Sequence, residues 1–229
     1  MDTHSLRQFD LHFPGHWIEG PDRDWAYENQ HLLSLIQTLF REAVAAYSMF
    51  RPPVILNTIE EILQQRENES PYEGCLNSIY AKAFVFALDG IQKLLSRLCE
   101  FLEPPQDVKS LVEEYEKQFG HHRYVRDSAI HIEDRGRGMK KPSGRVGRRS
   151  QERVPANIFL LGCLKVTTTA TNYCFTGEDG KQHEVEISEA ELLKAKRIIQ
   201  AIIYSYPWVP DTYRQIEQIV KQFTEDRDE

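Results

Sequence analysis

The chain has 229 residues, of which 41% are hydrophobic, and a formal net charge of −7 at pH 7. That length allows one good core, the lack of a recurrent period excludes a repeat array, and the negative charge argues against a protein that coats nucleic acid indiscriminately. We expect a soluble, unanchored protein, because residues 1–20 lack the apolar core of a signal peptide and no uncharged run is long enough to span a membrane. We expect a reducing cytoplasm, because the four cysteines are scattered and form no C-x-x-C pair.

The first half of the chain predicts helices. Residues 1–23 carry Pro and Gly and are predicted to form an N-terminal arm, after which apolar residues recur at helical spacing from Asp24 to Phe50. The sequence Arg51-Pro52-Pro53 ends that pattern. A shorter helix is predicted over Leu56–Gln65.

The longest predicted helix runs from Tyr72 to Leu102, where two prolines follow. We expect its buried stripe to pass through Leu76, Ile79, Tyr80, Ala83, Phe86, Ala87, Ile91, Leu94, Leu95, Leu98 and Phe101. The next helix contains Val108–Phe119, and Gly120 is predicted to close it in the left-handed conformation.

The helix that begins near His121 contains the most informative residues of the chain. Arg126 and His131 lie five residues apart, so their Cα directions differ by about 140° around a helix, and Asp127 lies four residues before His131, close enough to orient its ring. The same spacing recurs at Arg7 and His12, but in the N-terminal arm rather than on a helix. The alternative is that Arg123–Asp127 and Asp127–His131 are ordinary surface pairs.

Arg126, Asp127 and His131 resemble the R-x4-6-H motif of the HEPN superfamily, in which Asn, Asp or His commonly follows the arginine. The resemblance covers the motif and, more loosely, the long helices before it, whereas the segment after about Arg153 has no counterpart. It implies an antiparallel helical bundle with metal-independent ribonuclease activity and no cofactor. It also implies a homodimer in which the motifs of two protomers meet. Members of the family often belong to toxin–antitoxin or antiviral defence systems, so the resemblance implies an antitoxin or regulatory protein as a further partner. Some family members have lost catalysis and serve as binding modules.

One branch of the family has a tyrosine two residues after the motif histidine, which a partner antitoxin modifies. This chain has Glu133 at that position, so the sequence does not support such regulation.

A basic, glycine-containing loop follows the motif over residues 135–154. From charge alone it reads equally well as a solvated insertion or as a segment that gathers phosphates, and its position after His131 favours the second interpretation. The predicted RNA-binding residues are Arg135, Arg137, Lys140, Lys141, Arg145, Arg148 and Arg149.

The remaining chain predicts a small β segment and two helices. Residues 156–187 read as a β-hairpin or three-stranded sheet, with a turn at residues 177–180. Ser188 and Glu191 form a capping box that opens a helix ending before Pro207, and a last helix is predicted from Asp211. The predicted fold is therefore mainly α, one HEPN-like bundle over residues 24–226 with a small sheet before the C-terminal helices.

Through the resemblance to the HEPN superfamily, Arg126, Asp127 and His131 predict an endoribonuclease that cleaves RNA through attack of the 2′-hydroxyl. His131 suits proton transfer, because an imidazole titrates near pH ~6.5, and Arg126 suits stabilisation of the transition-state charge, with Asp127 fixing the histidine tautomer. A catalytically silent helical interaction module is the alternative, and RNA binding without cleavage is a third. No metal site is predicted, because the adjacent His121 and His122 would diverge on a helix.

Overall fold

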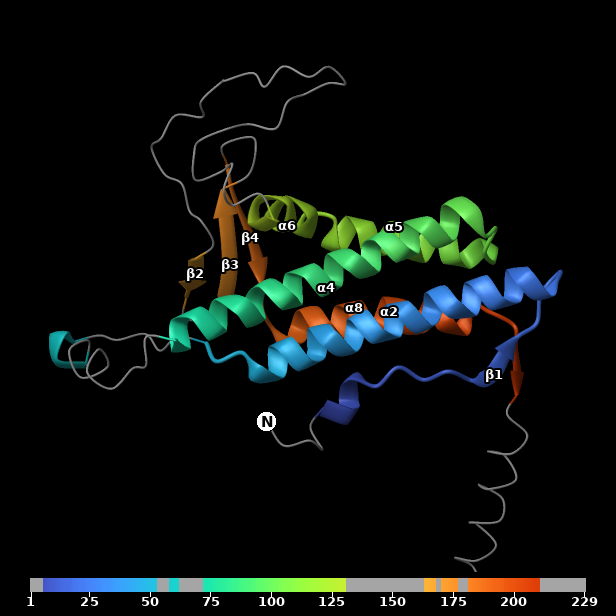
Figure 1. Cartoon of the computed structure of the whole chain (residues 1–229), viewed down its shortest axis with the longest axis horizontal. Coiled ribbons are helices and arrows are strands. Elements are labelled where there is room, and N and C mark those ends of the chain that lie inside the picture. The colour runs from blue at the N-terminus through green and yellow to red at the C-terminus, as the bar shows by residue number, and fades with distance from the viewer. Residues whose placement is uncertain are drawn as a thin grey trace, which may run out of the picture.

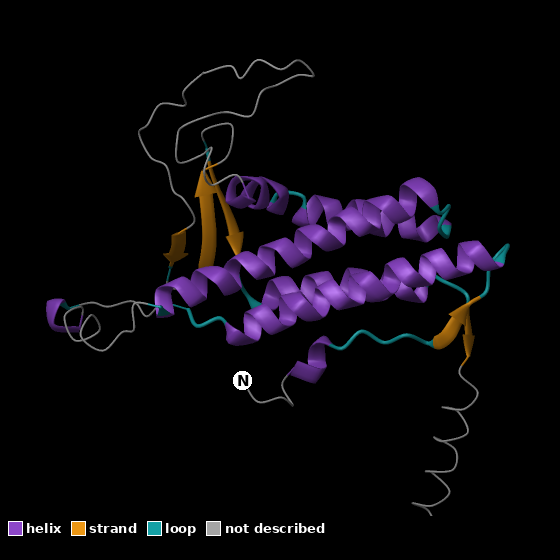
Figure 2. Ribbon diagram, in the orientation of Figure 1, coloured by secondary structure: helices purple, strands orange, loops and turns teal. Residues whose placement is uncertain are grey.

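A computed structural model of the chain describes residues 6–52, 58–61, 72–130, 163–167, 170–176 and 181–210. This part of the chain is mainly helical, as predicted, and contains two small antiparallel sheets, of which the sequence predicts one (Figures 1 and 2). Its helices are η1 (Arg7–Phe9, a 3-10 helix), α2 (Arg23–Met49), α4 (Glu73–Phe101), α5 (Gln106–Phe119), α6 (His122–Ile130) and α8 (Glu189–Tyr204). Its strands are β1 (Gly15–Ile18), β2 (Cys163–Val166), β3 (Thr171–Thr176), β4 (Gln182–Glu186) and β5 (Trp208–Pro210). Among the helices of these residues, none has the length and apolar character needed to cross a membrane.

Four helices form an antiparallel bundle. Helix α2 packs against α4 and α8, and α5 packs against the same two helices from the other side. Figure 1 shows that the chain reverses direction from each of these helices to the next. The bundle encloses a single apolar core, whose largest fully buried side chains include Leu33, Ile36, Phe40, Phe84, Leu88, Ile91, Leu95, Leu98, Tyr115 and Phe119.

Three helix boundaries follow directly from the sequence. Helix α2 begins after Asp22, whose side chain accepts a hydrogen bond from the Trp25 backbone N–H at 2.7 Å, and it ends at Met49, just before Arg51-Pro52. Helix α8 begins after Ser188, whose hydroxyl accepts a hydrogen bond from the Glu191 N–H at 3.3 Å. The predicted N-terminus of α8 is therefore confirmed.

The predicted buried face of α4 is partly wrong. Leu76 and Ile79 are 44% and 58% exposed, whereas Phe84, Val85 and Leu88 lie in the core. The sequence of α4 is apolar on most of its circumference, so hydrophobic periodicity does not define one face. Packing against α2 on one side and α5 on the other determines which residues are buried.

The prediction of a left-handed cap at Gly120 is also wrong. Gly120 has φ −59° and ψ −24°, which is right-handed helical geometry, and α6 begins two residues later. A Cβ at this position would lie 2.5 Å from the Glu116 carbonyl oxygen. The close approach of the backbone, and not a positive φ, therefore requires glycine here.

Of the two predicted alternatives, a β-hairpin or a three-stranded sheet, the structure has the three-stranded sheet, in the order β2-β3-β4 with both pairs antiparallel. Tyr173, Phe175 and Val185 are buried on the face that joins the core, and α6 packs against β3 and β4. The ring of Tyr124 on α6 stacks on that of His183 on β4, with 4.8 Å between centroids. The sheet therefore supports the helix that carries Arg126.

Residues 6–18, expected in an arm before the bundle, take part in the same core. Phe9 and Ile18 are buried, and β1 pairs antiparallel with β5, a strand that the sequence does not predict. The last predicted helix, most of the predicted helix over Leu56–Gln65, and the loop at 135–154 lie outside the described residues.

Candidate functional site

Helix α6 positions the first two residues of the motif. Val125 is fully buried and anchors the helix against the core, while the neighbouring Arg126 and Asp127 remain partly accessible, with side chains 12% and 31% exposed. Because α6 packs against α4, Arg126 faces the middle of that long helix. The motif arginine therefore lies between the two helices and not on an open surface.

The guanidinium of Arg126 is held by two carboxylates. Its Nη1 donates to Oδ2 of Asp89 on α4 at 2.7 Å, and its Nε donates to Oδ1 of Asp127 at 3.0 Å. Its Nη2 contacts the same Asp127 oxygen. Burial lowers the pKa of Arg126, but the hydrogen bonds to the two carboxylates outweigh this effect and the net shift is upward.

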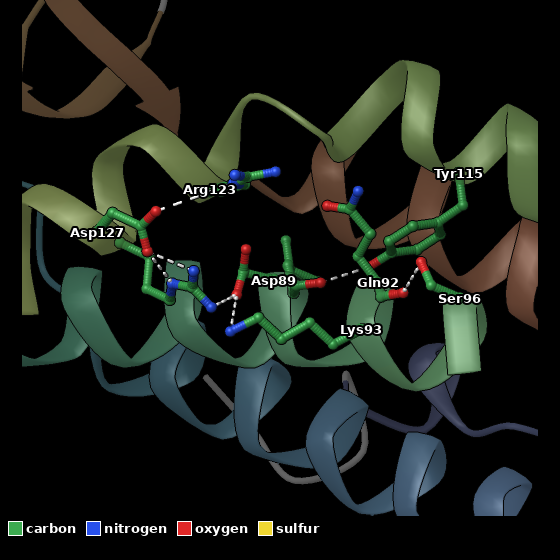
Figure 3. Close-up of polar contacts among 9 residues, drawn as sticks. Asp89, Gln92, Lys93, Ser96, Tyr115, Arg123 and Asp127 are labelled. Carbon is green, nitrogen blue, oxygen red and sulfur yellow. Dashed lines mark hydrogen bonds and ion pairs between the residues drawn. The ribbon is translucent and has the colours of Figure 1, made fainter. Parts of the chain in front are cut away.

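Asp89 is the most buried charge of this cluster, with only 2% of its surface exposed. Burial raises its pKa, and the hydrogen bond from Arg126 opposes that rise without cancelling it. Lys93, one turn later on α4, lies 3.2 Å from the same Asp89 oxygen. Figure 3 shows Asp89 and Lys93 on α4 facing Arg123 and Asp127 on α6.

The carboxylate of Asp127 contacts two arginines of α6. Besides its contacts with Arg126, its Oδ2 lies 3.9 Å from Nε of Arg123, one turn earlier. The Arg123–Asp127 ion pair, which the sequence analysis gives as the alternative to a catalytic role, is therefore present. The predicted role of Asp127 in orienting His131 stays a prediction, because His131 lies outside the described residues.

A cavity of about 560 Å³ lies along this cluster, between α4 and the pair α5 and α6. The described residues that line it include equal numbers of cationic and anionic side chains. The cations are Lys93, Arg97, Arg123 and Arg126, and the anions are Asp89, Glu100, Glu116 and Asp127. The lining alone is electrically balanced, so attraction of a polyanion would depend on charges elsewhere in the chain.

Those charges are present in the sequence directly after α6. His131 and the seven predicted RNA-binding residues Arg135, Arg137, Lys140, Lys141, Arg145, Arg148 and Arg149 all lie outside the described residues. The structure therefore brings together Arg126 and Asp127 from the predicted site, and adds Asp89 and Lys93 from α4.

The sequence prediction missed Asp89, although the sequence contains a usable signal. Asp89 is the one acidic residue in the otherwise apolar stretch from Phe84 to Ile91. A carboxylate on a core-facing helix is almost never fully buried unless it is paired. Its partner could not be identified from sequence, because Arg126 lies 37 residues further along the chain.

The adjacent histidines at the start of α6, His121 just before the helix and His122 as its first residue, differ strongly in environment. His121 is exposed overall, although partial burial of its ring lowers its pKa. His122 is fully buried, and burial lowers its pKa to about 3. Neither ring nitrogen of His122 has a hydrogen-bond partner in the described part of the chain. Within those same residues, no group of three or more His, Cys, Asp or Glu side chains is arranged to hold a metal ion.

The arrangement can present a fixed guanidinium to an oxyanion. A guanidinium has five N–H donors, and three take part in the contacts with Asp89 and Asp127. One N–H on Nη1 and one on Nη2 have no acceptor among the described residues. Two such donors in a planar fork match two oxygens of a phosphate.

Comparisons of the chain with protein-family models, with curated proteins and with solved structures give no match. The functional argument therefore depends on the residues and geometry of this chain.

Proposed function

We propose that this chain is a metal-independent endoribonuclease of HEPN type. The observation that supports the proposal best is the position of Arg126, which is fixed by Asp89 and Asp127 at the wall of a cavity, five residues before His131. A basic segment of the sequence follows within a few residues and supplies the positive charge that the cavity lining lacks.

In the proposed reaction the ribose 2′-oxygen bonds to the adjacent phosphorus and the bond from phosphorus to the 5′-oxygen breaks. His131 accepts the proton of the 2′-hydroxyl, since an imidazole can act as a base near neutral pH. The two unpaired N–H donors of Arg126 hold the non-bridging oxygens as negative charge develops on them. The leaving 5′-oxygen takes a proton from a second His131 or from water.

The proposal includes a two-fold homodimer. One motif supplies a single histidine and a single arginine, and a symmetric pair would bring two of each to one cleft. Light scattering coupled to gel filtration would test this, with twice the chain mass expected. A role as a toxin or defence effector, controlled by an antitoxin, is part of the same proposal.

Incubation of purified protein with mixed RNA in EDTA tests the activity. Wild type should cleave and leave 2′,3′-cyclic phosphate ends, whereas Arg126→Ala and His131→Ala should not. The chain offers a matched control in Arg7→Ala and His12→Ala, which have the same spacing on a different part of the fold and should cleave like wild type. Equal cleavage by all five proteins would indicate contamination or another site.

A catalytically silent interaction module is the second candidate. The observation that favours it is that Asp89 and Asp127 already neutralise Arg126, as in a structural ion-pair network. No cleavage by any of the proteins would support this function, and His131→Ala would then change stability or partner binding instead.

A further inference from the structure

Two of the four cysteines lie directly opposite each other in the small sheet. The register of β2 and β3 pairs Cys163 with Cys174. Opposed residues of an antiparallel pair have Cα atoms about 4.5–5.5 Å apart, and a disulfide can close over Cα distances of about 4.4–6.8 Å. Both side chains point to the same face of the sheet, because directly paired residues share a face. Both cysteines are free thiols in this structure.

The environments of the two thiols differ. Cys163 is half-buried, whereas Cys174 is fully buried. The two thiols are close enough to hydrogen-bond, and Sγ of Cys174 also lies 3.7 Å from the Asn172 carbonyl oxygen. Burial, followed by the neighbouring Cys163, raises the pKa of Cys174 to about 11. Cys163 is therefore the thiol that a solution reagent reaches, and Cys174 is placed to react only with Cys163.

We propose that Cys163 and Cys174 are a redox-active thiol pair that closes to a cross-strand disulfide by exchange with a small disulfide such as oxidised glutathione. The Cys163 thiol first loses its proton to water and its sulfur attacks one glutathione sulfur, so that the glutathione S–S bond breaks and one glutathione leaves. The Cys174 thiol then loses its proton, its sulfur attacks Cys163, and the second glutathione leaves. The two thiols are oxidised by two electrons and one glutathione disulfide is reduced to two thiols.

The position of the pair gives the disulfide a structural consequence. Cys163 follows the basic segment of the sequence by ten residues, counted from Arg153. Cys174 lies on β3, one of the two strands against which α6 packs. The bond would covalently tie the strand after the basic segment to the sheet that supports the motif helix. An effect on RNA cleavage would depend on the proposed function, whereas formation of the bond would not.

Peptide mapping of the native, full-length chain tests the proposal. Trypsin cuts after Lys165, so it places the two cysteines on separate peptides, residues 154–165 and 166–181, which stay joined only if the disulfide is present. After incubation with oxidised glutathione and an acid quench, we expect the two peptides joined, with a mass lower by two hydrogen atoms than the sum of the two reduced peptides. Reduction should separate the peptides.

Two variants and one internal control make the test specific. Cys174→Ala should trap glutathione on Cys163, because no second thiol can displace it, and Cys163→Ser should leave Cys174 unmodified in the folded protein. The exposed Cys75 is an internal control, since it should take up glutathione and form no link to either peptide. Persistent glutathione on Cys163 of the wild-type chain, or joined peptides that appear only after denaturation, would overturn the proposal. Neither result would bear on RNA cleavage.

Discussion

The contact between Asp89 and Arg126 makes a quantitative prediction about stability. Asp89 is 2% exposed and the Arg126 side chain 12%, so either single substitution leaves a poorly solvated charge that has lost one ion-pair partner. Asp127 still contacts Arg126 in Asp89→Asn. Removal of one partner from a buried ion pair costs about 3–5 kcal/mol. Lys93 remains 3.2 Å from Asp89 in Arg126→Gln, which moves the expected cost for that variant to about 3 kcal/mol, the lower end of the range.

The double variant Asp89→Asn/Arg126→Gln should be more stable than the sum of the two costs implies. It removes both charges and leaves two amides that can hydrogen-bond to each other, so we expect a coupling energy of about 2 kcal/mol. In a chain of this length 1 kcal/mol corresponds to about 2–4 °C, so Arg126→Gln should lower Tm by about 6–12 °C and the double variant should recover part of that loss.

Urea unfolding and RNA cleavage should be measured on the same four proteins, wild type included. If Arg126 contacts the substrate, the double variant regains stability but remains inactive. If cleavage returns with stability, Arg126 acts only on the fold and the proposed catalytic role is wrong. Strictly additive costs below about 1 kcal/mol for each substitution would refute the argument itself, because they would mean that the pair is well solvated.

Three further predictions follow from other residues. The folded-state pKa of His122 is about 3, below its unfolded value of 6.5, so the stability linked to it is present above pH 6.5 and is lost as the pH falls towards 3. Between pH 7 and pH 5, urea titrations should therefore show that wild type loses about 2 kcal/mol more unfolding free energy than His122→Phe. Equal losses in the two proteins would contradict the lowered pKa of His122. Ser188→Ala should cost about 1 kcal/mol by removing the N-terminal cap of α8, and a Tm equal to that of wild type would show that the cap contributes nothing. Neutralising three loop arginines should reduce the slope of a plot of log affinity for single-stranded RNA against log salt concentration by about 2. An unchanged slope would mean that the loop does not contact the RNA phosphates. The variants are Arg145→Gln, Arg148→Gln and Arg149→Gln, with Arg41→Gln, Lys109→Gln and Lys117→Gln on exposed helix faces as the matched control.

Local patterns in the sequence determined much of the secondary structure. Helix α8 begins where its capping box predicts, because a cap is a contact between residues three apart in the chain, and both α2 and α8 end shortly before the prolines that follow them. The three-stranded sheet was predictable for a similar reason, since turn residues and short apolar runs alternate over a few positions. The motif Arg126-Asp127 was also found from sequence alone.

Only the tertiary structure decided which faces are buried and what Arg126 contacts. Helix α4 is apolar on nearly every side, so its neighbours α2 and α5 select Phe84 and Leu88 for the core. Strands β1 and β5 are each too short to be recognised alone, and they exist because they pair across almost the whole length of the chain. The ion pair of Asp89 with Arg126 depends on the packing of α4 against α6, because no local pattern relates two residues 37 positions apart.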